Sequence, residues 1–134
     1  MVLPMIEFRL DPRSGVPTYL QLVQQVKQAL RLGILQPGDQ LPTVKEVVGT
    51  LAINPNTVLK AYRELDREGV TEGRRGQGTF VSQDQPAALP SDYSALRSAL
   101  LKWIDRAQKA GLDDESINAL VVATLNAVFF EEAA

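Results

Sequence analysis

Hydrophobic and polar residues alternate along this chain with two different periods. Near the start, Ile6, Phe8 and Leu10 alternate with charged residues, which predicts a short β-strand. From 17 to 32 the apolar positions recur at spacings of three and four, which predicts a helix that Gly33 ends. The QPGD that follows is typical of a turn.

Two short amphipathic helices follow, and they carry the clearest helix signals in the chain. Thr43 and Glu46 form a T-x-x-E capping box, and apolar residues over 44–51 fall at i, i+3, i+4 and i+7. Asn54 suits an N-cap and Pro55 suits the first position of a second helix, which repeats the same apolar spacing. Because only a few residues join them, the two helices should cross steeply, as in a helix-turn-helix.

A glycine-rich segment, VTEGRRGQGTFV, comes next and predicts a β-hairpin. Its Arg74 and Arg75 fit three interpretations: a phosphate cradle, a solvated turn, or the wing of a winged helix. The glycine order is not that of a dinucleotide-binding motif and no helix opens after it, which disfavours the cradle. The position directly after a helix-turn-helix favours a wing, whose arginines would lie near DNA phosphates or in the minor groove.

The last third of the chain is predicted to contain a linker and two helices. Residues 83–91 contain two prolines and little periodicity. One apolar stripe then runs to Gly111, and Asp113 or Asp114 can cap a last helix that is apolar nearly all round. That helix is too short to span a bilayer, so another surface must cover it, and a second copy of the tail could do so. The expected members of this four-helix dimer core are Leu100, Trp103, Ile104, Leu120, Val121, Leu125, Val128 and Phe129.

Composition narrows the possible chemistry. The 134 residues include no cysteine and no histidine, which excludes disulfides and removes the commonest general base and zinc ligand. The adjacent acids at 113–115 are explained by the dipole of the helix that they begin. We therefore expect no enzyme, no metal and no cofactor. The first ten residues do not resemble a signal peptide, so we expect a cytoplasmic protein with no membrane partner.

The charge is uneven along the chain. The net charge is −2, but residues 1–81 carry ten Lys/Arg and eight Asp/Glu, whereas residues 82–134 carry four and eight. The first part is therefore mildly basic (+2) and the second distinctly acidic (−4). Such asymmetry is compatible with a nucleic-acid module joined to a second module.

The second helix of the pair has an outer face suited to reading DNA. Asn56 could pair with an adenine edge, and Thr57 could bond a base or touch a thymine methyl. Asn54 serves either as the helix cap or as a DNA contact, and Lys60 follows on the same outer face. The later basic residues are interleaved with acids and indicate a mixed-charge surface. Leu59, off the main apolar stripe, either meets a thymine methyl or is buried.

The motifs together resemble a known family. The segment 33–43 matches G-x-[IL]-x-P-G-x-x-L-P-S except for Thr at its last position, 57–69 matches T-V-x-x-A-[LY]-x-x-L-x-x-x-G, and 76–81 matches G-x-G-T-[FY]-V. These are patterns of the winged-helix domain of GntR-family bacterial transcription regulators, and the resemblance covers about 17–82. The upstream segment and the short tail resemble the YtrA subfamily, in which a two-helix tail serves dimerisation.

The resemblance implies a mainly α fold with a small β-wing. A winged helix-turn-helix DNA-binding domain would occupy 1–82, a linker 83–91, and a two-helix dimerisation domain 92–134. Many members have arginine at the positions of Lys45 and Pro55, so the operator sequence cannot be borrowed from them. The expected DNA-binding residues are Thr43, Lys45, Asn54, Pro55, Asn56, Thr57, Lys60, Arg74, Arg75, Gly76 and Gln77.

The function expected from this resemblance is that of a homodimeric regulator. It would repress a transporter operon by binding a two-fold, double-stranded operator. If the protein has a small-molecule effector, it would bind between subunits or between the tail and the winged domain. Two rivals remain at this point. One is a winged helix used only for protein–protein contact, which the acidic net charge favours; the other is a small-molecule sensor with a secondary DNA role.

Overall fold

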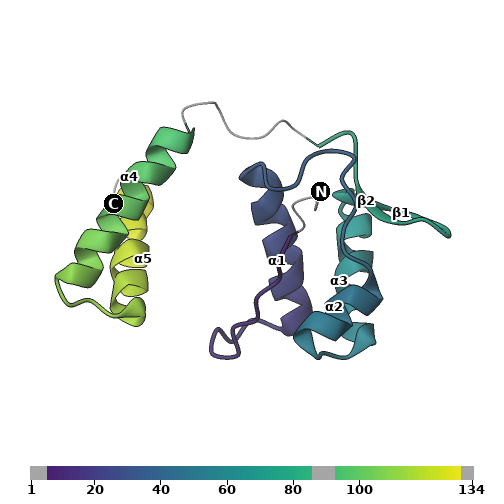
Figure 1. The fold of residues 1–134 in the computed structure, drawn as a ribbon, viewed down its shortest axis with the longest axis horizontal. Helices are drawn as coiled ribbons and strands as arrows, with labels where there is room; N and C mark the ends of the chain where they lie inside the picture. The colour runs from purple at the N-terminus through teal and green to yellow at the C-terminus, as the bar shows by residue number, and fades with distance from the viewer. Residues whose placement is uncertain (1–5, 86–92, 131–134) are drawn as a thin grey trace. The chain divides into compact units, whose positions relative to one another are not determined.

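The structure is a computed structural model that describes residues 6–85 and 93–130. The chain divides into two compact units, Met1–Leu89 and Pro90–Ala134. The predicted fold class, mainly helical with a small β-wing, is confirmed (Figure 1). The elements are, in order, α1 (Thr18–Arg31), α2 (Val44–Leu51), α3 (Pro55–Arg67), β1 (Thr71–Arg74), β2 (Gly78–Val81), α4 (Tyr93–Lys109) and α5 (Asp114–Phe130).

The first unit packs three helices and a hairpin around one apolar core. The helices α1 and α3 lie side by side, and α3 also packs on α2 and β1 (Figure 1). Each helix contributes the stripe that its periodicity predicted, so that α3 buries Val58, Ala61, Tyr62 and Leu65. The largest side chains that are fully buried are Leu22, Val26, Leu35, Val58, Leu65 and Val81.

The caps of the helix-turn-helix are confirmed. Glu46 N–H donates to Thr43 Oγ1 at 3.1 Å, and Thr43 N–H donates to Glu46 Oε1 at 3.2 Å. Asn56 N–H donates to Asn54 Oδ1 at 2.8 Å, and Pro55 opens α3. The turn between them contains Ala52 with φ 54° and ψ 42°, a left-handed conformation that costs an alanine about 1 kcal/mol or more.

The predicted strand at residues 6–10 is wrong, although its alternation correctly marked Ile6 and Phe8 as buried. Two glutamines of α1 take the place of a partner strand. Gln25 accepts from Arg9 N–H at 2.8 Å and donates to Arg9 O at 2.5 Å. Gln21 bonds both backbone groups of Asp11 in the same way, at 2.8 and 3.0 Å. Side-chain amides thus satisfy the polar backbone that a sheet would have satisfied.

The hairpin forms as predicted, but it is longer and its loop shorter than the glycine-rich run indicated. The strands β1 and β2 pair antiparallel with Thr71 opposite Val81 and Arg74 opposite Gly78, which leaves only residues 75–77 in the loop. A third segment, whose pairing the sequence did not predict, lies along the outer edge of β2. Leu41 N–H donates to Thr79 O at 2.8 Å, and Val81 N–H donates to Asp39 O at 2.7 Å.

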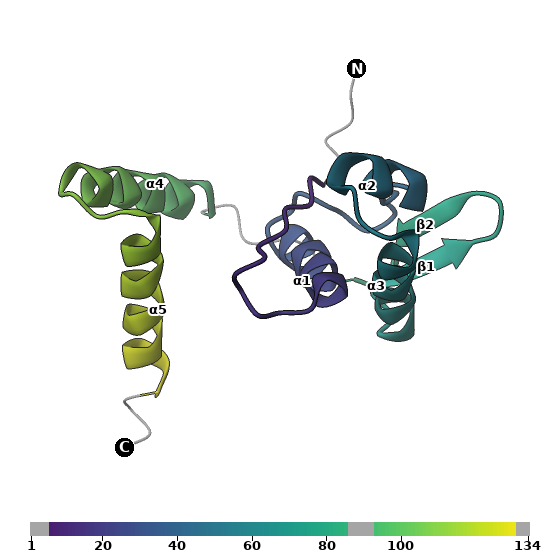
Figure 2. The same ribbon diagram turned by 90° about the horizontal axis from the view of Figure 1, so that it is seen from below.

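The second unit contains α4 and α5. Ser116 N–H donates to Asp113 Oδ1 at 2.8 Å, so Asp113 caps α5, and this hydrogen bond holds the pKa of the Asp113 carboxyl below its usual value. Figure 2 shows that α5 runs steeply away from α4 after the turn at Gly111. No described residue of α5 is buried. The predicted linker lies largely outside the described residues, from 86 onward.

None of the helices among the described residues is long and apolar enough to cross a membrane.

Candidate nucleic-acid interface and the exposed tail

The first turns of α3 present polar side chains to solvent. Asn54, Asn56 and Lys60 are exposed and Thr57 is half-buried. Asn54 is the cap, so its Oδ1 is already bonded to the Asn56 backbone N–H. The Asn56 side chain has no hydrogen-bond partner among the described residues, which leaves its amide available for a base edge. Leu59 is half-buried beside this surface.

The buried face of α3 fixes the angle at which these polar residues are held. Tyr62 Oη donates to Pro42 O at 2.6 Å, which ties the middle of α3 to the residue before the α2 cap. Burial, and secondarily the charge of Glu46, raises the pKa of the Tyr62 hydroxyl well above its usual value, so it remains a donor. The two helices of the motif are therefore linked by a buried hydrogen bond as well as by apolar packing.

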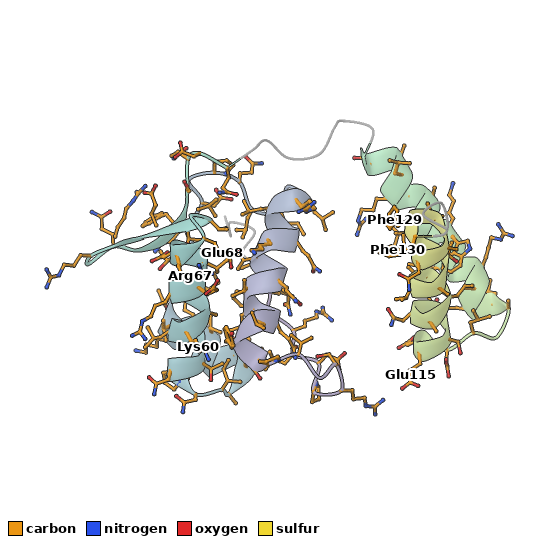
Figure 3. The ribbon with its side chains drawn as sticks, turned by 180° about the vertical axis from the view of Figure 1, so that it is seen from behind. Lys60, Arg67, Glu68, Glu115, Phe129 and Phe130 are labelled. Atoms are coloured by element: carbon orange, nitrogen blue, oxygen red, sulfur yellow. The ribbon has the colours of Figure 1, made fainter. Side chains whose placement is uncertain are left out.

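Lys60 is held by a contact that the sequence did not reveal. Its Nζ lies 4.2 Å from the ring centre of Tyr19, at the start of α1, which is a cation–π geometry. The far end of α3 is different in character (Figure 3): Arg67 pairs with Glu64, and Glu68 pairs with Lys27 of α1. This half of the helix is the mixed-charge surface that the alternating signs predicted.

The wing tip is a three-residue turn. Gln77 N–H donates to Arg74 O at 2.9 Å, and Gly76 has φ 75°, the third-position geometry of a type II turn that favours glycine. The two arginines differ: Arg75 lies in the turn, whereas Arg74 ends β1 and its guanidinium lies 4.3 Å from the Phe80 ring centre. Of the two arginines, only Arg75 therefore lies in the loop of the hairpin.

A shallow groove of about 530 Å³ separates the wing from the start of α2. It is lined by Thr43 and residues 73–79, and Gln40 Nε2 donates to Gln77 O at 3.1 Å across its edge. The structure thus brings Thr43, Arg74, Arg75, Gly76 and Gln77 together. Lys45 is exposed on α2. Among the described residues, no hydrogen bond or ion pair joins this group to residues 54–57, which form a second polar cluster at the start of α3.

The predicted dimerisation residues do not form a core within one chain. Trp103, Ile104 and Val121 are half-buried. The other five are exposed, by 53% at Leu100, 45% at Leu120 and Leu125, 60% at Val128 and 66% at Phe129. Four large apolar side chains that the prediction omitted are also exposed, namely Leu96, Leu101, Val122 and Phe130. Leu96 and Leu101 belong to α4, whereas Val122 and Phe130 belong to α5, whose apolar character on every side was their sequence signal.

The described residues contain no group of three or more acidic side chains placed to hold a metal ion.

Comparison with known proteins agrees with this geometry. Residues 18–81 match the model of the bacterial regulatory proteins of the gntR family. The HTH-type transcriptional repressor YtrA of Bacillus subtilis (strain 168) is 40% identical over 111 residues, which cover 82% of this chain and 85% of that protein.

Two solved structures extend the comparison. A transcriptional antiterminator from Listeria monocytogenes EGD-e is similar over 88% of this chain and 89% of its own, with a TM-score of 0.57 and 32% identity. The DNA-binding domain of AraR, solved in complex with operator ORX1, is similar over 58% of this chain and 98% of its own, with a TM-score of 0.51 and 26% identity.

Proposed function

Because this chain belongs to the GntR family of DNA-binding transcription regulators, with a YtrA-like organisation, we propose that it is a homodimeric repressor that binds a two-fold operator. The observation that carries the proposal is the pair of exposed polar clusters, at the start of α3 and around the wing, on a winged-helix frame. A relative with the same frame was solved on operator DNA. The named relatives are regulators and not enzymes.

Base reading is proposed for the start of α3. With α3 in the major groove, Asn56 and Thr57 reach base edges, and Asn54 holds the helix end with its cap bond. Lys60 meets a backbone phosphate, since Tyr19 holds its ammonium at the side of the helix. Pro55 has no hydrogen-bond donor, so the reading of sequence falls to Asn56 and Thr57.

Phosphate binding is proposed for α2 and the wing. Lys45 is an exposed cation on α2, and Arg75 is an exposed cation that lines the groove between the wing and Thr43. Arg74, stacked on Phe80, stiffens the base of the wing and adds positive charge beside the turn. Gly76 and Gln77 offer backbone that can approach the duplex closely. These contacts position the protein on the DNA without reading its sequence.

Dimerisation is proposed for the tail, with residues 1–82 as the DNA-binding domain, 83–91 as the linker and 92–134 as the dimerisation domain. The support is the large apolar surface of α5, none of which is buried in one chain. Patches of this kind mark interaction sites on soluble proteins. The YtrA-like organisation further suggests a transporter operon, including the regulator's own gene, as the target.

Footprinting on DNA upstream of its own gene tests this proposal. Two protected half-sites about one helical turn apart, 10–10.5 bp centre to centre or a multiple of that, are expected from a dimer with one α3 in each. Affinity should fall steeply with salt, because several phosphates are neutralised. A protein–protein module would give no protection and no preference over random DNA, and this result would replace the proposed function.

A further inference from the structure

The wing is held to the rest of the winged unit at its base. Val81 N–H donates to Asp39 O at 2.7 Å. Leu41 N–H donates to Thr79 O at 2.8 Å, and these two bonds form a short ladder along the outer edge of β2. The tip of the hairpin projects beyond this ladder, away from the helices (Figure 1).

The next rung of the ladder is missing, and the side chain of Gln40 replaces it. In the same register, that rung would join Thr43 N–H to Gln77 O. Thr43 N–H instead donates to Glu46 Oε1 in the capping box, at 3.2 Å. Gln40 Nε2 donates to Gln77 O in its place, at 3.1 Å. One glutamine amide thus supports the wing two residues closer to its tip than the backbone ladder does.

Gly78 leaves the space that this side chain needs. Gln40 and Phe80 lie opposite each other, so their side chains share one face of the sheet, and Gly78 is the next position on that face toward the tip. A Cβ atom at Gly78 would lie 2.7 Å from Gln40 Nε2, too close for a non-bonded contact. Among the described residues, Gln40 makes the only hydrogen bond that joins residues 75–78 to a segment outside the hairpin.

We propose that Gln40 is a positioning residue for DNA binding, which holds the wing tip and its Arg75 at a fixed place relative to α2 and α3. Gln40 does not contact the duplex itself. A tip that is ordered before binding loses little conformational freedom on the DNA, so the Arg75 contact is made at a lower entropic cost. This inference rests on the proposed DNA-binding function and adds a residue to it.

Gln40→Met tests this role, because methionine keeps the length of the side chain and removes the amide donor. Gln40 is exposed and lies outside the core, so the melting temperature should change by less than about 4 °C. The backbone amide order parameters of residues 75–77 should fall from about 0.85 to below about 0.6. Gln28→Met, which changes an exposed glutamine of α1, is the matched control and should leave them unchanged. Order parameters that stay high in Gln40→Met would overturn the proposal.

Binding to the operator found by footprinting separates positioning from direct contact. Gln40→Met should weaken operator binding by about two- to tenfold for each wing, since the released tip must be ordered on the DNA. In an Arg75→Ala background the same change should lose most of its effect, because the contact that Gln40 positions is already gone. Equal factors in both backgrounds would mean that Gln40 contacts the DNA independently of Arg75, which overturns the positioning role.

These results are distinct from a failure of the proposed function. If the unaltered chain protects no operator and shows no preference over random DNA, the DNA-binding function itself fails. If the unaltered chain binds its operator and Gln40→Met binds equally well, the function stands and only the role of Gln40 is overturned.

Discussion

The winged unit and the tail use similar apolar side chains in opposite ways. In the winged unit Leu65 is 0% exposed and Val81 1%, and the apolar stripes of three helices meet in one core. In the tail Leu96 and Phe130 are both 67% exposed, and α5 buries none of its described residues. Burying one such side chain contributes about 1.5–3 kcal/mol. The winged unit therefore has a closed core as a single chain, whereas we propose that the tail gains its stability by association.

The largest expected effect distinguishes a buried leucine of the winged unit from an exposed leucine of the tail. Leu65→Ala should lower the free energy of unfolding of the winged unit by about 2–5 kcal/mol at any protein concentration, since it opens a cavity in a closed core. Leu100→Ala, 53% exposed in one chain, should act only through association. Denaturant titrations at two protein concentrations measure both. Fluorescence of Trp103, the only tryptophan, reports the tail.

The same titrations can contradict this contrast between the two units. If Leu100→Ala costs as much as Leu65→Ala at the lowest protein concentration, the tail has a core of its own and the contrast fails.

The next effect concerns sequence reading, which should belong to the winged unit alone. Asn56→Ala or Thr57→Ala should weaken operator binding by roughly 1–3 kcal/mol and leave binding to random DNA nearly unchanged. The exposed Asn118 of α5 provides a matched control, because Asn118→Ala removes the same amide from the tail. Competition gel shifts measure both. Uniform loss on operator and random DNA would mean that these residues position α3 without reading bases.

A smaller effect is expected from the wing. Replacing Arg74 and Arg75 by Ala should flatten the salt dependence, by about 0.9 in the log–log slope for each phosphate contact removed. Arg75→Ala alone should account for most of the change, because the Arg74 guanidinium is stacked on Phe80. Arg97→Ala, an exposed arginine of α4, should leave the slope unchanged. An unchanged slope in the double wing variant would leave a solvated hairpin with no DNA role.

The smallest effect compares one substitution in the two units. Ala52→Gly should stabilise the winged unit by up to about 1 kcal/mol, because glycine adopts the left-handed conformation of Ala52 without strain, less the entropy it adds to the unfolded chain. Ala119→Gly, inside α5, should instead destabilise its helix by about 1 kcal/mol. Thermal unfolding measures the sign of the stability change in both variants. Loss of stability in Ala52→Gly would contradict the strain assigned to that turn.

Much of this fold is predictable because its signals are local. The capping box at Thr43, the cap at Asn54 and the period of α3 are each set within a few residues, and all are present in the structure. The buried positions of the helices follow from the same spacing. For the candidate site, the glycine run located the wing, and the acids among the later basic residues of α3 correctly indicated a mixed-charge surface.

The features that escaped prediction depend on partners far along the chain. Alternation at residues 6–10 gave the burial correctly but not the hydrogen-bond partners, which are glutamines of α1. The pairing of Gln40 with Phe80 joins segments 40 residues apart, and Lys60 meets Tyr19 across two helices. Arg74 is part of β1 because the pairing of β1 with β2 continues to Gly78. Such contacts are set by tertiary packing and leave no local pattern.

The division of labour between the units is tested most directly by a chain that ends after Gln85. This fragment should stay folded on its own core, sediment as a monomer, and bind the operator 10²–10⁴-fold more weakly, because the avidity of two linked modules is lost. The intact protein should sediment as a dimer at micromolar concentration. A fragment that remains dimeric, an intact protein that is monomeric, or equal operator affinities for the two would contradict the account.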